Sequence, residues 1–290
     1  MYNKPFRLKT SILLFIVSVS LWPTEQALAD WFQEGSAEFL FNDNLNRAIL
    51  ESDIRSDISL EGAFVGGYFS QVAEYTGVTA SAAFTLAHFQ EYSDLNNVSL
   101  NLGLSFNHKF GVGDKVPRLN GTVSIGEHKY EYEIRDVEVR RADLSLVKRF
   151  NDYLELSFGV KHEDRRSDHY LSLDTNSFST YVSGFLDINA RDWIGFSYTR
   201  RSGEITSSSS TSTLMLNAST ATNRDHTFDN GVPIIAYRLD AETDVYSIDW
   251  NRAISESSTF YVGYEKQDSK ASAGINYDTN IFRTGLMLSW

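Results

Sequence analysis

Hydrophobic and polar residues alternate along most of the chain with a period of two. In the segment 98–110, Val98, Leu100, Leu102, Leu104 and Phe106 alternate with serine, asparagine and glycine. An extended strand places successive side chains on opposite faces, whereas the faces of a helix repeat every 3.6 residues. The pattern therefore predicts β-strands that have one apolar face and one polar face.

About twelve segments carry this alternation, and the connections between them alternate in length. The segments are 36–44, 57–71, 77–90, 98–110, 118–131, 139–150, 153–163, 178–188, 193–201, 243–253, 257–267 and 282–290. The longer connections are 45–56, 91–97, 132–138, 165–177, 202–242 and 268–277. Short turns at one end and long loops at the other are typical of outer-membrane barrels, which satisfy all backbone polar groups by closure. We predict an all-β fold, a transmembrane antiparallel up-and-down β-barrel of about twelve strands with both termini in the periplasm.

The first residues have the organisation of a secretory signal. Lys4, Arg7 and Lys9 precede the apolar run 12–22, and Ala27-Leu28-Ala29 forms a small-x-small site for cleavage before Asp30. That order of a charged region, a short apolar region and small residues is typical of signal peptides, and the apolar run is short for a bilayer span. We predict a signal peptide at 1–29, one barrel domain at 30–290, and the bacterial outer membrane as the location. The chain has no cysteine, which fits an oxidising envelope compartment.

Aromatic residues make up 13% of the chain and cluster where strands meet connections. Amphipathic rings favour the level of the lipid headgroups, so two bands of them predict two girdles. The girdle predicted near the short turns consists of Phe110, Phe150, Tyr153, Trp193, Trp250, Phe260 and Trp290.

If the apolar face meets lipid, the opposite face lines a lumen that holds many charges. The charged residues expected there are Glu38, Glu61, Lys109, Arg141, Asp143, Arg149, Glu155, Lys161, Glu163, Asp187, Arg201, Asp249, Glu265 and Arg283. Such a lining fits a channel for small polar solutes or ions, including saccharides. It fits equally a lumen closed by salt bridges. The loop 202–242, which is rich in serine and threonine, either constricts the barrel or is a mobile external loop.

Three segments resemble known outer-membrane proteins. Phe282, Leu286, Leu288 and Trp290 are similar to the terminal signature of Gram-negative barrels, which implies the barrel assembly machinery as a partner of the C-terminal strand. The segments 41–48 and 141–168 resemble barrels of the exopolysaccharide-associated and surface lipoprotein assembly modifier type. This second resemblance implies an alternative role, a non-conducting barrel that supports export or anchoring of surface polysaccharide or lipoprotein.

Other classes of function find less support in the sequence. A net charge of −12 argues against a nucleic-acid binder, and we predict no nucleic-acid partner. Asp168-His169 and Asp225-His226 superficially match the Asp–His pair of barrel proteases, but their flanking residues do not match. His88 and His108 are predicted to lie at opposite ends of neighbouring strands, so they cannot share a catalytic site. We therefore predict no enzyme, no catalytic residue, no metal site and no cofactor. The expected partners are outer-membrane lipid, lipopolysaccharide bridged by divalent cations to loop acids, and small polar solutes.

Overall fold

The computed structural model describes residues 29–229 and 231–290. The predicted signal peptide, 1–29, lies almost wholly outside the described residues, and its cleavage stays a prediction. Within the described ranges, no helix has both the length and the apolar character needed to cross a membrane.

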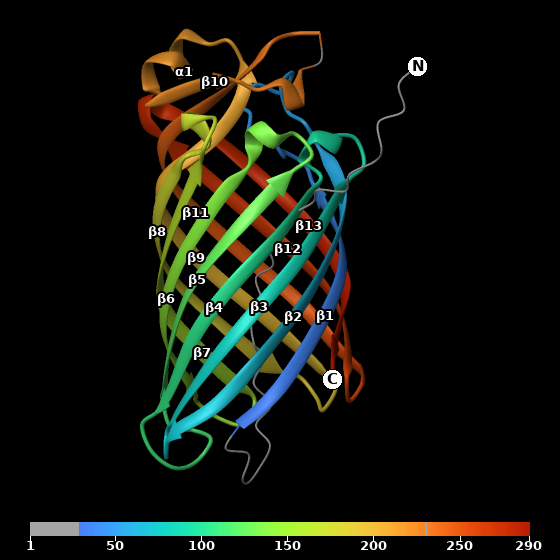
Figure 1. The fold of residues 1–290 in the computed structure, drawn as a ribbon, viewed down its shortest axis with the longest axis vertical. Helices are drawn as coiled ribbons and strands as arrows, with labels where there is room; N and C mark the ends of the chain where they lie inside the picture. The colour runs from blue at the N-terminus through green and yellow to red at the C-terminus, as the bar shows by residue number, and fades with distance from the viewer. Residues whose placement is uncertain (1–28, 230) are drawn as a thin grey trace.

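Twelve antiparallel strands close into a barrel, as the periodicity predicts. They are β1 (Ala29–Asn42), β2 (Asp57–Ala73), β3 (Thr76–Phe89), β4 (Asn97–Lys109), β5 (Arg118–Tyr130), β6 (Val137–Arg149), β7 (Leu154–Ser167), β8 (Thr175–Asp187), β9 (Asp192–Ser210), β11 (Ile234–Ser255), β12 (Ser258–Ala271) and β13 (Ile275–Ser289). Neighbours in sequence pair with one another, and the pairing of β1 with β13 joins the two ends of the sheet. The described part of the chain is therefore an up-and-down barrel (Figure 1).

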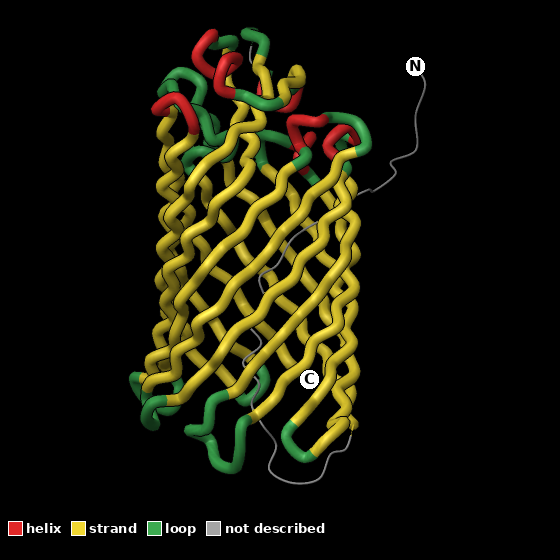
Figure 2. Tube along the Cα trace, turned by 90° about the vertical axis from the view of Figure 1, so that its left-hand side faces the viewer, coloured by secondary structure: helices red, strands yellow, loops and turns green. Residues whose placement is uncertain are grey.

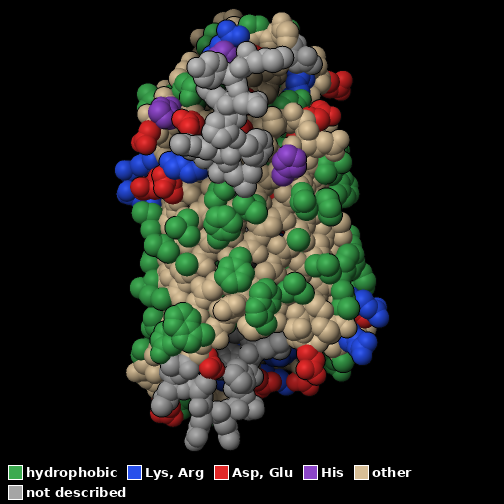
Figure 3. Space-filling view, turned by 45° about the vertical axis from the view of Figure 1, so that its right-hand side comes forward, with side chains coloured by type: hydrophobic (Ala, Val, Ile, Leu, Met, Phe, Trp, Pro, Cys, Tyr) green, Lys and Arg blue, Asp and Glu red, His purple; other side chains and the backbone are tan. Residues whose placement is uncertain are grey.

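The barrel places its apolar strand positions outward. Leu100, Leu102 and Leu104 on β4 are each 53% exposed. Exposing this much apolar surface to water would cost free energy. Hydrophobic side chains cover the middle of the face seen in Figure 3, and charged ones gather near its two ends. A continuous apolar wall between charged ends is the surface that a bilayer requires.

The two ends of the barrel differ in the length of their connections (Figures 1 and 2). The short connections are 74–75, 110–117, 150–153, 188–191 and 256–257. The connections at the other end are 43–56, 90–96, 131–136, 168–174, 211–233 and 272–274. The C-terminal residue lies at the end with the short turns (Figure 1). Five of these connections also contain a short 3-10 turn, including η2 (Glu133–Arg135) and η4 (His226–Phe228).

Two predicted loops are wrong in extent. The segment 202–242 is not one long loop, because β9 continues to Ser210 and β11 already begins at Ile234. Between them lie α1 (Thr213–Ala218) and β10 (Ala221–Arg224), which pairs with β11. The segment 268–277 is mostly strand, and only three residues separate β12 from β13. In both places the backbone continues to pair beyond the point where hydrophobic alternation ends.

Candidate functional site

The predicted lumen charges all occupy the strand positions that alternate with the exposed apolar residues. On β6, for example, Arg141 and Asp143 alternate with Leu144 and Leu146, which are both 44% exposed on the outer wall. We call this set of positions the lumen phase. Side chains on the concave face of a closed barrel converge, whereas those on the convex face diverge.

Ion pairs between lumen-phase residues reach over an intervening strand. Arg118 on β5 contacts Glu155 on β7 at 2.9 Å, although β6 lies between them. Arg149 on β6 likewise contacts Asp187 on β8 at 2.7 Å. Contacts of this kind are possible because the side chains lean toward one another across the concave wall.

In another contact over an intervening strand, a glycine makes room for the side chain. Tyr181 on β8 donates its hydroxyl to Asp143 on β6 at 3.0 Å, and the ring passes over Gly159 of β7. A Cβ at position 159 would lie 2.3 Å from Cζ of Tyr181. Glycine is thus the residue that allows the tyrosine to lie flat against the wall.

The same arrangement recurs twice near the seam of the barrel, where a long side chain crosses a glycine to reach an acid two strands away. The two cases are Tyr261 over Gly285 to Glu38, at 2.7 Å, and Arg283 over Gly263 to Asp249, at 3.6 Å. The tyrosines and glycines of this arrangement were not predicted as site residues. Their signal in the sequence is a glycine in the lumen phase, which period-two analysis counts merely as a small polar position.

Acidic and basic groups gather on different parts of the wall. Glu38 on β1 stands directly opposite Glu61 on β2, and Ser59 donates to Glu61 at 3.2 Å. On β6 and β7, by contrast, Glu163 is surrounded by cations. Its carboxylate lies 2.6 Å from Arg141, 3.7 Å from Lys161 and 4.0 Å from Arg165. The lumen phase is therefore acidic near β1 and β2 and basic near β6 and β7.

The remaining predicted lumen charges lie near the two ends or on other strands. Glu265 on β12 accepts a hydrogen bond from Gln267 at 2.7 Å. Lys109 is the last residue of β4, beside the short turns, and Arg201 lies on β9 opposite Thr243 of β11.

Most residues of the predicted girdle lie exposed near the short turns. Trp290 is 64% exposed and its ring lies 6.3 Å from that of Phe64, while Trp250 packs edge-on against Phe260 at 6.2 Å. The exposed members at this end are Phe110, Phe150, Tyr153, Trp250 and Trp290. Trp193 differs, because it shares the lumen phase of β9 and pairs with Asn251 of β11.

The loops at the opposite end form a cap over the mouth, which the sequence analysis did not anticipate. We use "cap" for the connections 43–56, 90–96, 131–136, 168–174 and 211–233 together with the projecting ends of β9 and β11. At its centre lies Asp225, which is 3% exposed. Its Oδ2 accepts hydrogen bonds from Arg135 and from Ser208 Oγ, each at 2.7 Å. One buried carboxylate thus joins the connections 131–136 and 211–233 to the projecting end of β9.

Further hydrogen bonds join the first loop to β9. Asn46 donates to the backbone carbonyl of Ser208 at 2.7 Å, and Ser208 N–H donates back to the carbonyl of Asn46 at 2.8 Å. Asp53 accepts from both the N–H and the hydroxyl of Ser210. The loop 43–56 therefore lies against the projecting end of β9 instead of extending away from the barrel.

Apolar contacts and a further carboxylate complete the cap. The ring of Phe228 lies 5.2 Å from that of Tyr92 and 5.4 Å below the guanidinium of Arg135. At the hairpin tip, burial would raise the pKa of Asp229, but hydrogen bonds from Ile234 N–H, Arg224 and His226 outweigh it and lower the pKa below its ordinary value. The connections 43–56, 90–96, 131–136 and 211–233 are thus all held by polar or aromatic contacts.

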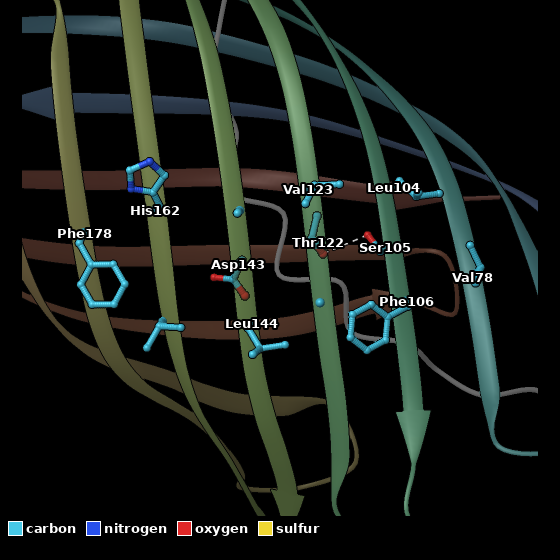
Figure 4. A pocket seen from close by; sticks show the side chains of 13 residues that line it. Val78, Leu104, Ser105, Phe106, Thr122, Val123, Asp143, Leu144, His162 and Phe178 are labelled. Carbon is cyan, nitrogen blue, oxygen red and sulfur yellow. Dashed lines mark hydrogen bonds between the residues drawn. The ribbon is translucent and has the colours of Figure 1, made fainter.

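The outer wall carries a shallow groove across β3 to β8. Its floor is mainly apolar, with Leu104, Val123 and Leu144, and His162 and Phe178 lie beside it on β7 and β8 (Figure 4). Asp143 also lines this groove, but its side chain lies in the lumen phase, where its carboxylate accepts from Tyr181. The groove therefore brings together no nucleophile, base and acid in hydrogen-bond contact, which nucleophilic catalysis would need.

The other histidines also lie apart. His88 is near the cap end of β3, whereas His108 is near the short turns and bonds Thr76 at 2.9 Å. Among the described residues, no group of three or more histidines and acids could hold a metal ion.

Solved structures of outer-membrane channels have a fold similar to that of this chain. The COG4313 outer membrane channel from Pseudomonas putida F1 matches with a TM-score of 0.59 at 10% identity, over 89% of this chain and 95% of that chain. The KdgM porin in complex with disordered oligogalacturonate matches with a TM-score of 0.48 at 10% identity, over 88% and 99%. No protein-family model and no curated protein matches the sequence. The similarity at this identity shows the fold, which is that of an outer-membrane β-barrel.

Proposed function

We propose that the protein is an outer-membrane channel that passes small polar solutes or ions, including saccharides. In this proposal residues 1–29 are removed as a secretory signal, and both termini of the barrel face the periplasm. The apolar outer wall supports insertion in a bilayer, and the polar lumen phase supports an aqueous path.

The course of the lumen ion pairs is the observation that carries the proposal. Arg118–Glu155, Arg149–Asp187 and Arg283–Asp249 each join strands only two places apart. These pairs lie along the wall and do not bridge opposite sides of the barrel. A lumen closed by salt bridges would need contacts across its centre, so the wall-bound pairs favour a hydrated passage.

The proposed partners follow from the two ends of the barrel. Trp290 ends the closing strand beside β1, where its N–H donates to the carbonyl of Gln33 at 3.1 Å. We assign this terminal strand to recognition by the barrel assembly machinery. At the cap end, loop acids such as Glu51, Asp94 and Asp168 would meet lipopolysaccharide through divalent cations.

The cap favours a second candidate function. Because buried Asp225 joins two connections and the end of β9 over the mouth, the barrel could be closed at that end and serve without conducting. This is the role of a barrel that supports export or anchoring of surface polysaccharide or lipoprotein, which the resemblance of segments 41–48 and 141–168 implies.

Single-channel recording of the refolded full-length protein in a planar bilayer distinguishes the two candidates. We expect discrete conductance steps and a measurable reversal potential in a salt gradient. A shift in gel migration between unboiled and boiled samples serves as the control for folding. A folded sample that gives no conductance steps would contradict the channel and favour the non-conducting barrel.

A further inference from the structure

Several polar atoms around the cap end of the lumen have no hydrogen-bond partner. They include Nη2 of Arg141, Nε and Nη2 of Arg201, Nε2 of His128 and the hydroxyl of Tyr277. His128 is 2% exposed and Tyr277 is 7% exposed. Buried polar groups are nearly always paired, so a cluster of unpaired ones indicates a missing partner.

These groups belong to one electrostatic neighbourhood. Arg201 interacts with Arg47, Tyr277 and Glu163. His128 interacts electrostatically with Arg141, Arg165 and Glu163. The unpaired groups come from β5, β6, β9 and β13, so they surround a common part of the lumen.

Positive charge exceeds negative charge in this neighbourhood. Its cations are Arg47, Arg141, Lys161, Arg165 and Arg201, and its carboxylates are Asp143, Glu163 and Glu265. Glu163 is already shared among three of the cations. Clustered guanidinium groups repel one another unless an anion neutralises them, and their planar donors match oxyanions in a bidentate manner.

Small residues leave room between Arg201 and Tyr277. Thr243 of β11 and Ser269 of β12 lie between them along the wall, and their hydroxyls bond each other at 2.9 Å. Both side chains are short, so they extend little into the lumen between Arg201 and Tyr277.

The cap adds one cation under backbone strain. Arg47 has φ of 53°, in the left-handed region that residues other than glycine seldom adopt. Its N–H donates to Asn44 at 3.1 Å, and its carbonyl accepts from Ser207 Oγ at 2.7 Å. Its Nη1 donates to the carbonyl of Thr206 at 3.4 Å, and its charge interacts with Arg201 and Tyr277. Non-glycine residues held in this region cluster at functional sites.

We propose that Arg141, Arg201 and Arg47, with His128 and Tyr277, form a binding subsite for the oxyanion group of a solute, a carboxylate or a phosphate. This inference rests on the proposed channel function and deepens it, because it places a selective binding site in the lumen beneath the cap. The guanidinium donors bind the oxyanion, and Tyr277 donates its hydroxyl to it.

Adjacent arginines on opposite faces of the same strands provide matched variants. The inner pair is Arg141 and Arg201, and the outer pair is Arg140, which bonds Glu138, and Arg200, which bonds Glu242. The double variants R141Q/R201Q and R140Q/R200Q therefore remove equal charge from the same two strands. Inorganic phosphate is the probe. Its binding is measured by calorimetry on the detergent-solubilised barrel and by its block of single-channel current. The same measurements with acetate test whether a carboxylate binds.

We expect R141Q/R201Q to weaken phosphate binding by about tenfold or more, because each lost charge-assisted hydrogen bond carries at least that factor. It should also shift the reversal potential in a potassium chloride gradient toward cation selectivity. R140Q/R200Q should leave both quantities unchanged. If R141Q/R201Q fails to fold, as judged by heat-modifiable migration, Tyr277→Phe and Arg47→Asn, which tolerates the left-handed backbone, replace it.

The outcomes separate the subsite from the channel. Phosphate binding that is equal in the inner and outer variants, or absent from the wild type, would overturn the subsite even if the channel conducts. Phosphate binding lost only in the inner variant would support the subsite even if no conductance is seen, and the channel proposal alone would then fail.

Discussion

At the scale of single residues, glycines in the lumen phase decide which side chains can meet. Tyr181 reaches Asp143 only because position 159 has no side chain. The ring then lies along the wall, which keeps its bulk out of the central space and fixes the acid. A glycine here serves close packing, a role different from the conformational one it has in turns.

We expect Gly159→Ala to destabilise the barrel by about 1–3 kcal/mol, the usual cost of inserting a methyl group into a packed site. The new Cβ would lie 2.3 Å from Cζ of Tyr181, so the ring must leave its hydrogen bond with Asp143. Urea unfolding in lipid vesicles, followed by tryptophan fluorescence, measures the change.

Gly62→Ala is the matched control, because the nearest atom to its Cβ, the carbonyl oxygen of Ser36, is 3.8 Å away. In a Tyr181→Ala background the cost of Gly159→Ala should fall. An equal cost in both backgrounds would show that the two positions are not coupled.

The sequence predicts the phase of each strand but not these pairs. Alternation follows from the geometry of an extended backbone, so the lumen phase of Arg141 or Glu163 can be read directly. Which residue of β8 meets which residue of β6 depends on register and on the tilt of the closed barrel, and period-two patterns leave both undetermined.

At the scale of elements, the projecting hairpin of β9 and β11 differs most from the structure that the amino-acid composition predicts. The run Ser207 to Ser210 has the composition of a flexible segment, yet it is paired strand. Its hydroxyls and backbone bind Arg47, Asp225 and Asp53 from other connections. Serine is compatible with either state, and only partners distant in sequence determine which one forms.

We expect Asp225→Asn to loosen the cap without unfolding the barrel. The change removes the charge that holds Arg135 and weakens an acceptor that serves Ser208 as well, and breaking a buried ion pair on one side costs about 3–5 kcal/mol. That cost falls on the cap, because the strand ladders of the barrel are not involved.

Limited proteolysis of the refolded protein provides the measurement, with faster cleavage within 211–233 as the expected result. Asp240→Asn removes the same charge from an exposed position on β11 and should not change the rate. Unchanged cleavage in Asp225→Asn would mean that the apolar contacts of Phe228 hold the cap by themselves.

At the scale of the whole molecule, the two faces of the wall meet different solvents, and this difference explains both the composition and the fold. Only alternate strand residues need to be apolar, so a hydrophobic fraction of 42% suffices for a membrane wall. The barrel, its strand number and its two unequal ends were predictable from that alternation. The cap was not, because its contacts join five connections that are far apart in the sequence.

The strongest test of this arrangement compares neighbouring residues on one strand. Leu104 on β4 is 53% exposed on the outer wall, and Ser105 lies in the lumen phase. A lysine on the lipid face near the middle of the bilayer costs about 2–4 kcal/mol, whereas a lysine in a hydrated lumen costs little. We therefore expect Leu104→Lys to reduce refolding into vesicles strongly, and Ser105→Lys to refold like the wild type.

The folded fraction is read from heat-modifiable migration at a series of urea concentrations. Ser105→Lys should in addition reduce conductance to cations, since it adds positive charge to the lumen, while the surviving folded fraction of Leu104→Lys should conduct normally. If the two lysines cost the same free energy, both faces of β4 would meet the same solvent. The lumen would then be either dry or unformed, and the channel would lose its physical basis.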